Sequence, residues 1–204
     1  MKNIKTYYTS DRHFWHKSIC GEEGFEPTRR HFNTVEEMNE YLINRHNETA
    51  TQADECYDLG DFAFYGKPRE IAELVMSLNG NIILIQGNHD SQSKWTKILK
   101  LLDGETLNSK PKLEIHPMGI HKKINGIHLY LTHFPLDAGL RPKIFSVSGH
   151  IHSEPSKNIN QINVGADSPL IESEVGFGVP IEQEHLMRII EQRKEEIIKL
   201  KYKI

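Results

Sequence analysis

Residues 82–90 read Ile-Ile-Leu-Ile-Gln-Gly-Asn-His-Asp, an apolar run followed at once by polar residues. A short apolar run bounded by turn and polar residues is typical of a strand buried in a sheet. Asn88, His89 and Asp90 then stand where the chain leaves that strand. In open α/β sheets this carboxyl edge collects ligands, because the loops that leave successive parallel strands converge there.

Four other apolar runs end in the same way. The runs at 4–8, 56–59, 129–131 and 144–147 lead into Asp11-Arg12-His13, Gly60-Asp61, Thr132-His133 and Gly149-His150-Ile151-His152. A single motif of this kind, such as Asn-His-Asp in a loop, is more often a turn or a cap than a ligand set. Five of them, each at the end of an expected strand, predict one shared metal site.

The first half of the chain alternates strands with helices. Thr34-Val35-Glu36-Glu37 has the capping-box form and predicts a helix to about residue 47. Pro68 suits the first turn of a second helix that Asn79-Gly80 ends, and a third is expected over 92–102. This order predicts crossover connections and a parallel sheet.

The pattern changes after Pro111. Asn125-Gly126 separates two alternating runs at 120–124 and 127–132, which is the sequence signature of a tight hairpin. We therefore expect the second half to be antiparallel, with further strands at 113–115, 144–147 and 159–164 and about seven strands in total. The predicted fold class is α/β, with two packed mixed β-sheets flanked by helices in a single domain over 1–204.

The C-terminal segment, about 182–204, is predicted to be a charged amphipathic helix. Its apolar residues recur at helical spacing, and they are Leu186, Ile189, Ile190, Ile197 and Leu200. We expect this side to pack on its own domain, and a dimer contact is the alternative.

Composition limits the classes of function. The formal net charge is -3, and no run rich in Lys and Arg appears, so we expect no binding of long duplex nucleic acid, whereas short or single nucleotides remain candidates. The longest apolar run has far fewer than the roughly 18 residues that a membrane span needs. The N-terminus lacks the apolar region of a secretory signal, so we expect the chain to start at Met1 and to be cytoplasmic, with Cys20 and Cys56 as free thiols.

The ligand types suit hydrolysis of a phosphate ester by two divalent ions, which activate a bridging water and neutralise the phosphoryl oxygens. Two ions held roughly 3.5 to 4 Å apart need a shared anionic ligand, and we assign that role to Asp61, whose carboxylate follows a glycine at a strand end. Asp11 and His13 are two residues apart, and in an extended segment both side chains would point the same way. His150 and His152 have the same spacing.

The ordered set D-x-H, G-D, G-N-H-D, H and G-H-x-H resembles the calcineurin-like metallophosphoesterase superfamily, in particular its small phage and bacterial single-domain members, with a four-layer sandwich fold. The resemblance extends from Asp11 to His152. It implies one ion held by Asp11, His13, Asp61 and His152, and a second held by Asp61, Asn88, His133 and His150. It also implies that His89 touches the scissile phosphate, that Asp90 fixes its imidazole from behind, and that Arg12 offers a cation to the phosphate.

The expected function is that of a dinuclear-metal-dependent phosphoesterase that hydrolyses a small phosphodiester or nucleotide-type ester by attack of a metal-bridging hydroxide. The alternatives are a metal-dependent nuclease on short single-stranded nucleic acid and a catalytically silent scaffold. A ligand set without thiolate suits Mn²⁺, Fe²⁺ or Zn²⁺, with Mn²⁺ expected in vitro. We expect a small phosphorylated substrate, no membrane partner, and a monomer or homodimer.

The segment between the first ligands and Thr34 is long and mixed, and it is well placed to wall a substrate pocket. His16 is a candidate to stack on a base, and Arg29 and Arg30 are candidates to hold a second phosphate. The alternative for each is that the aromatic residues pack beneath the loop and the arginines are solvated.

Overall fold

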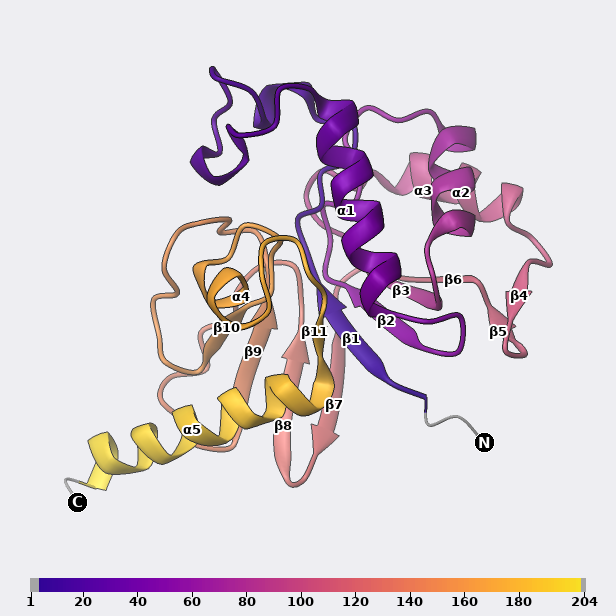
Figure 1. The fold of residues 1–204 in the computed structure, drawn as a ribbon. Coiled ribbons are helices and arrows are strands. Elements are labelled where there is room, and N and C mark those ends of the chain that lie inside the picture. The colour runs from indigo at the N-terminus through magenta and orange to yellow at the C-terminus, as the bar shows by residue number, and fades with distance from the viewer. Residues whose placement is uncertain (1–3, 203–204) are drawn as a thin grey trace.

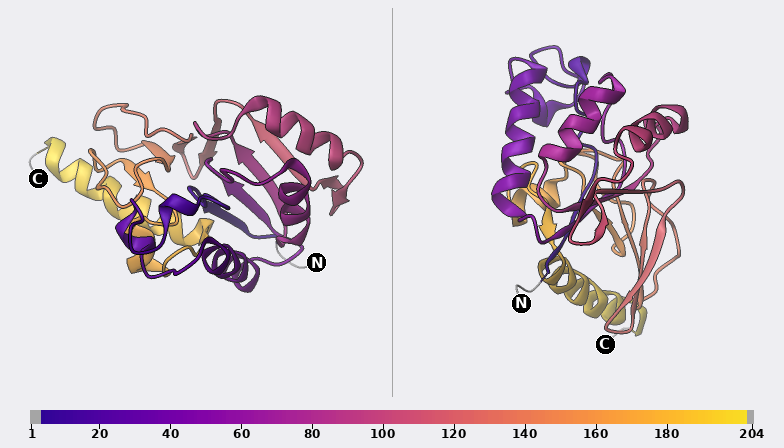
Figure 2. Two further views of the ribbon diagram at one scale, coloured as in Figure 1. Left: turned by 90° about the horizontal axis from the view of Figure 1, so that it is seen from above. Right: turned by 90° about the vertical axis from the view of Figure 1, so that its right-hand side faces the viewer.

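The computed structural model describes residues 4–202, which form two mixed sheets with helices against them (Figure 1). The first sheet has the strand order β11-β1-β2-β3-β6, and the second has the order β10-β9-β8-β7. This confirms the predicted class of two packed mixed sheets flanked by helices. Figure 2 shows the arrangement from above and from the side.

The first sheet contains the strands expected from the N-terminal half. β1 (Thr6–Thr9), β2 (Glu55–Asp58) and β3 (Asn81–Ile85) pair in parallel, and β6 (Leu113–His116) adds to β3 in parallel as well. β11 (Ile181–Glu182) closes the other edge and pairs with β1 in the antiparallel sense.

Three helices cover one face of this sheet, and each begins where the sequence indicates. The helices are α1 (Val35–Thr49), α2 (Pro68–Ser77) and α3 (Gln92–Leu101). The side chain of Thr34 accepts a hydrogen bond from the amide of Glu37, as a capping box requires. The buried apolar residues of all three helices pack with those of the sheet, including Tyr7, Cys56 and Ile82, in one core.

The second sheet contains β7 (Ile120–Ile124), β8 (Ile127–Leu131), β9 (Ile144–Ser148) and β10 (Gln161–Asn163). Asn125 and Gly126 both have positive φ, 49° and 79°, and they turn β7 into an antiparallel β8 as predicted. The expectation of an antiparallel second half was wrong beyond this hairpin, because β8, β9 and β10 pair in parallel. Long connections separate these three strands, and parallel pairing needs such connections.

A second core lies between the two sheets. Tyr8, Leu59 and Ile85 face it from the first sheet, and Leu129 and Phe145 face it from the second. Helix α5 (Gln183–Tyr202) contributes its buried residues to this core, so it packs on its own domain. Of its expected apolar side, Leu186, Ile189, Ile190 and Ile197 are buried, whereas Leu200 is 61% exposed and was wrongly assigned to it. Residues 203–204 of the predicted helix lie outside the described residues.

The remaining elements are short. They are β4 (Thr106–Leu107), β5 (Lys110–Pro111), α4 (Pro169–Glu174) and the 3-10 helices η1 (Lys17–Ile19) and η2 (Pro27–Arg29). Cys20 and Cys56 are free thiols, as expected. Within residues 4–202, no helix combines the length and the apolar character that crossing a bilayer requires.

Candidate metal centre

The side chains proposed as metal ligands follow the carboxyl ends of β1, β2, β3, β8 and β9 (Figure 1). We expected the segment after β1 to be extended, and this was wrong. Asp11 and His13 have φ values of 55° and 50°. Asp61, His150 and His152 also have positive φ, at 54°, 71° and 48°. Non-glycine residues rarely adopt this left-handed conformation, and it is found most often at functional sites.

One carboxylate oxygen of Asp61 lies among three imidazole nitrogens. Its Oδ2 atom is 3.5 Å from Nε2 of His13, 3.4 Å from Nε2 of His133 and 3.9 Å from Nε2 of His89. Two ligand atoms that bind the same ion at about 2.1 Å lie about 3 to 3.5 Å from each other. The first two separations therefore suit a carboxylate and an imidazole on the same ion.

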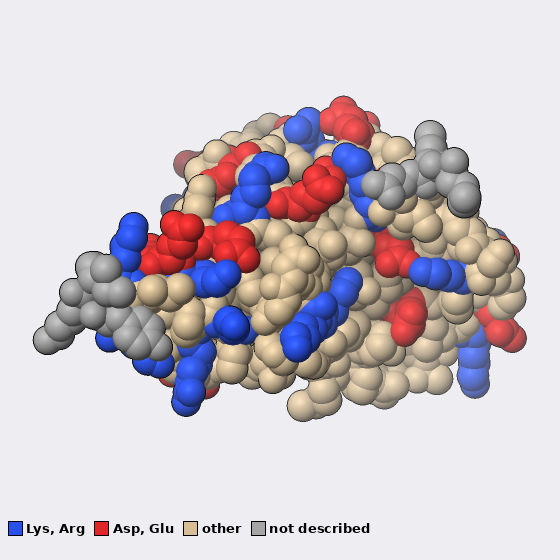
Figure 3. All heavy atoms as spheres, turned by 90° about the horizontal axis from the view of Figure 1, so that it is seen from below, with Lys and Arg blue, Asp and Glu red and all other residues tan. Residues whose placement is uncertain are grey.

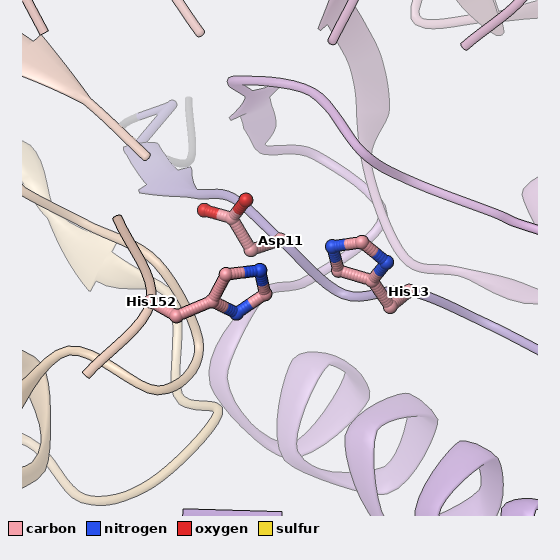
Figure 4. Close-up of side chains that lie close together, drawn as sticks. All are labelled: Asp11, His13 and His152. Carbon is pink, nitrogen blue, oxygen red and sulfur yellow. The ribbon is translucent and has the colours of Figure 1, made fainter. Parts of the chain in front are cut away.

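Two groups of side chains converge closely enough to hold an ion. The ligand atoms of Asp11, His13 and His152 lie within 4.8 Å of one another, and so do those of Asp11, Asp61 and His133. Figure 4 shows the first group, in which Asp11 and His13 come from the segment after β1 and His152 from the loop after β9. A third such group contains Glu26, His152 and Asp167.

Among residues 4–202, His150 belongs to neither of the first two groups. Its ring packs beside His133 with a centroid separation of 5.1 Å, and its backbone amide donates to Asp11 Oδ2 at 2.9 Å. Asn88 is exposed, and its Oδ1 accepts from Nε2 of His133 at 2.9 Å. Burial lowers the pKa of His150, so its imidazole is neutral and able to bind a metal.

Two glycines allow the carboxylates to approach the backbone. A Cβ atom on Gly149 would lie 2.0 Å from Asp11 Oδ2, and one on Gly87 would lie 2.2 Å from Asp61 Oδ1. Neither glycine has a positive φ, so the space itself requires glycine at both positions. Both belong to the motifs that the sequence singles out.

Three of the histidines are held from behind through Nδ1, which leaves Nε2 as the ligand nitrogen. His133 Nδ1 donates to the carbonyl of Leu59 at 2.9 Å, and His152 Nδ1 donates to Asp167 at 2.5 Å. His13 Nδ1 lies 3.0 Å from Nδ1 of His16. Because a hydrogen bond at one ring nitrogen fixes the tautomer, all three rings are prepared to bind a metal.

Nε2 of His13 shows most clearly that the donor set suits a metal ion. This atom is buried and has no hydrogen-bond partner, and burial with nearby cations keeps the pKa of His13 far below its usual value. A buried polar atom without a partner is costly unless something binds it. A divalent ion between His13 and Asp61 fits the free nitrogen, the carboxylate and their separation.

The pKa of His133 indicates how strongly the group of Asp11, Asp61 and His133 attracts a cation. Burial opposes protonation of His133, but the hydrogen bond to Asp61 and the charges of Asp11 and Asp61 outweigh it and raise the pKa of His133 to about 9. A proton on this ring thus offsets two carboxylates, and a divalent cation would do so more effectively.

Asp167 is the residue whose importance the sequence did not reveal. It is buried, accepts from His152 Nδ1, and forms a two-point ion pair with Arg29, one contact of which is 2.9 Å. The signal that could have found it is position, since it follows β10 and Gly165, which bridges to Ser10 beside the first ligands.

Asp90 does not contact the imidazole of His89, which corrects our expectation. Its Oδ2 accepts from the amides of Asp61 at 2.7 Å and Gly87 at 2.9 Å, and its Oδ1 accepts from Trp95 Nε1 at 3.1 Å. Asp90 therefore ties the loops after β2 and β3 together. His89 is held instead by its own amide, which donates to Asp61 Oδ1 at 2.8 Å, and its side chain is 39% exposed.

Two of the arginines proposed for substrate binding are buried and have other partners. Arg12 is 2% exposed, and its Nε lies 2.9 Å from Asp58 while its guanidinium donates to His46 at 2.9 Å. Arg29 is fully buried and donates to Asp167 and to the backbone carbonyls of Arg12 and Asp11. Both guanidinium groups are thus engaged with buried partners and are not exposed to a substrate.

The other two proposed substrate residues differ from each other. Arg30 is exposed, and its Nε donates to the carbonyl of Gly24 at 2.8 Å, so it fixes its own loop. His16 is 7% exposed and stacks on Phe64 with a centroid separation of 3.9 Å. Burial lowers the pKa of His16 to about 4, so its neutral Nδ1 can accept from His13. His16 thus orients a candidate ligand.

Comparison with known proteins agrees with the fold and the motifs. The sequence model of the family described as calcineurin-like phosphoesterase matches residues 4–183. An uncharacterized protein of Methanocaldococcus jannaschii, MJ1445, is 36% identical over 101 residues, which are 49% of this chain and 54% of that protein. The match thus spans about half the length of this relative.

A solved structure shares the fold. The crystal structure of a protein of unknown function, AQ665 from Aquifex aeolicus, superposes with a TM-score of 0.60 at 21% sequence identity. The match covers 92% of this chain and 100% of that chain. At this level of identity, the similarity concerns the fold alone.

Proposed function

The chain belongs to the calcineurin-like phosphoesterase family, and from this premise we propose that it hydrolyses a small phosphodiester or nucleotide-type phosphate ester with two divalent metal ions. Membership of this family implies hydrolase activity on phosphoesters. The observation that carries the proposal is Asp61 Oδ2 facing three imidazole nitrogens, of which the buried Nε2 of His13 has no hydrogen-bond partner.

The donors divide into two sets around that oxygen. In the proposal, Asp11, His13 and His152 hold one ion, and Asn88, His133 and His150 hold the other, with Asp61 shared between them. Two bound ions would supply a water of lowered pKa and positive charge against the phosphoryl oxygens. Carboxylate, amide and imidazole donors without thiolate suit Mn²⁺, Fe²⁺ or Zn²⁺.

His89 is the proposed proton donor to the leaving oxygen. Its imidazole is partly exposed, 3.9 Å from Asp61 Oδ2, and packed beside Phe64 with a centroid separation of 4.7 Å. The backbone bond to Asp61 fixes this residue relative to the shared carboxylate. An imidazole in this position can deliver a proton to an ester held at the ions, and it does not need to bind metal itself.

The test compares three variants in one assay with added Mn²⁺, using an aryl phosphodiester, an aryl monoester and cyclic nucleotides. Asp61→Asn should abolish turnover and reduce the metal content measured by elemental analysis, because a neutral amide cannot offset two ions. His89→Gln should keep its metal and lose about 10² to 10⁴ in turnover, the range for a lost general acid.

His185→Gln is the matched control, because His185 of α5 pairs with Glu174 of α4 and neither residue belongs to the proposed donor sets. It should retain both metal and turnover. Retention of two ions by Asp61→Asn would contradict the shared ligand, and loss of metal from His89→Gln would make His89 a ligand. Absence of turnover on every ester by the metal-loaded wild type would favour a catalytically silent scaffold.

A further inference from the structure

A cavity of about 960 Å³ adjoins the candidate metal centre. His150 and His152 form part of its wall together with other residues of the loop after β9 and Gln161 of β10, and the loop at 14–33 and the segment after β8 complete it. Its volume is within the range of small-molecule sites. Since two proposed ligands belong to the wall, an ester bound at the ions has this cavity directly beside it.

Two exposed aromatic rings stand on this wall. Phe25 is 53% exposed and meets the ring of His152 edge to face, with a centroid separation of 6.1 Å. Phe134 is 51% exposed and packs on His150 at 4.4 Å. The two rings come from different loops, and each packs against one of the proposed ligand histidines. Large exposed aromatic residues beside polar catalytic groups mark a ligand-binding surface.

The charge on the wall indicates what the ligand carries. Apart from the two histidines, the ionisable residues that line the cavity are Glu26, Asp137, Glu154 and Lys157, which gives three acidic groups and one basic group. Glu26 is 4% exposed, so solvent screens its charge weakly. Such a wall repels additional phosphates and tolerates a neutral or cationic group.

The position of His89 indicates which part of the ester enters. In the described chain, His89 is not among the residues that line the cavity, and it lies on the side of Phe64. A leaving group that His89 protonates therefore lies beside His89 and Phe64, outside the lining of the cavity. The group that stays on the phosphate is the one beside Phe25 and Phe134.

We propose that this cavity binds the retained organic group of the substrate, and that this group is a planar aromatic ring system with no phosphate other than the one being cleaved. The inference rests on the proposed function. The nucleoside of a nucleoside monophosphate esterified with a second alcohol and the aryl group of an aryl diester share this chemistry. A polynucleotide does not, because each neighbouring nucleotide would bring another phosphate toward the acidic wall.

The experiment uses two esters with the same leaving group, phenyl 4-nitrophenyl phosphate and methyl 4-nitrophenyl phosphate, with the Mn²⁺-loaded protein. The wild type should show a kcat/KM about tenfold higher for the phenyl ester, the size of a single stacking contact. Phe25→Leu and Phe134→Leu should each lower this ratio, and the double variant should bring it close to one. Leucine keeps the apolar character and removes the planar face.

Tyr65→Leu is the matched control, because Tyr65 is 65% exposed near the site but does not line the cavity, and it should leave the ratio unchanged. Metal content is measured for every variant. Phe134 also packs on His133, so Phe134→Leu could lose metal. In that case the ratio measured for Phe25→Leu tests the inference.

Three outcomes would overturn the inference. They are equal wild-type efficiencies on the two esters, an equal fall in the ratio for Tyr65→Leu, and cleavage of a short oligothymidylate with higher efficiency than the phenyl ester. In each of these the protein is still an active phosphoesterase, so only the assignment of the cavity is lost. Absence of turnover on all the esters would instead refute the proposed function, and the inference with it.

Discussion

Asp167 shows how a residue outside the donor set can control it. Its carboxylate lies between the guanidinium of Arg29 and Nδ1 of His152, and Arg29 in turn donates to the carbonyls of Asp11 and Arg12. Burial raises the pKa of Asp167, but the charge of Arg29 and the hydrogen bonds from His152 and Arg29 together outweigh it, so the net pKa is below the usual value and the group stays ionised. One buried anion therefore orients His152, on the loop after β9, and the backbone after β1.

We predict that Asp167→Asn lowers the metal affinity by about 10- to 100-fold, the usual effect of losing a group that orients a metal-binding histidine. Titration calorimetry with Mn²⁺ measures the change. Glu172→Gln is the control, because Glu172 is acidic, nearby in sequence and exposed, and its affinity should match the wild type. An unchanged affinity for Asp167→Asn would mean that His152 is oriented without it.

Metal binding should release protons at neutral pH. The pKa of His133 is raised to about 9, so below that pH the metal-free ring is protonated and an ion must displace the proton. The apparent affinity should therefore rise about tenfold per pH unit toward pH 9 and level off above it. Calorimetry at pH 7 in buffers of different ionisation enthalpy counts the protons. A heat that does not depend on the buffer would contradict the protonated ring.

At the scale of the elements, the loops bring their ligands together because glycines leave room for carboxylates. The sequence predicts most helix starts and strand positions, since caps, prolines and apolar runs are local signals. It did not predict the parallel pairing of β9 and β10, because a short apolar run does not specify the direction of its neighbour. Nor did it show that Arg12 and Arg29 are buried, since burial depends on side chains distant in sequence.

Gly149→Ala should disrupt the metal centre, since the added Cβ would lie 2.0 Å from Asp11 Oδ2. We expect loss of about 1 to 3 kcal/mol from the free energy of unfolding, as for overpacked sites, together with loss of bound metal. Urea unfolding and elemental analysis measure the two effects.

Gly104→Ala is the comparison, because that glycine has a φ of 82° and open space around it. It should cost about 1 kcal/mol through backbone strain alone and retain its metal. If Gly149→Ala binds metal like Gly104→Ala, the close approach of Asp11 is not needed.

At the scale of the whole molecule, the two cores place the donors at one edge and leave the opposite face without them. Figure 3 views that opposite face, where Lys and Arg are interspersed with Asp and Glu and form no continuous basic surface. This agrees with the expectation of no long duplex partner, which stays a prediction. The donor positions were predictable because each follows a strand. The segment before Thr34 was expected to wall a substrate pocket, and its Phe25, Glu26 and Pro27 line the cavity, whereas the place of Phe134 in the wall had no local signature.

Helix α5 joins the core between the sheets through Ile197, which is fully buried, while Leu200 one turn later is 61% exposed. Ile197→Ala should lower the free energy of unfolding by about 2 to 5 kcal/mol, and Leu200→Ala by less than about 0.5 kcal/mol. Urea unfolding at two protein concentrations measures both. A large effect of Leu200→Ala that grows with concentration would instead show that this side of α5 is a homodimer contact.

Five residues of the candidate metal centre have a left-handed backbone, and they are Asp11, His13, Asp61, His150 and His152. Residues in this region are each destabilised by about 1 to 3 kcal/mol, so they persist only where the surrounding scaffold holds them. The surrounding protein, and not the bound ion, then determines the orientation of these side chains. The metal site should therefore be preorganised and bind an ion without refolding. Exchanging Mn²⁺ for Zn²⁺ should then change the reactivity far more than the backbone conformation.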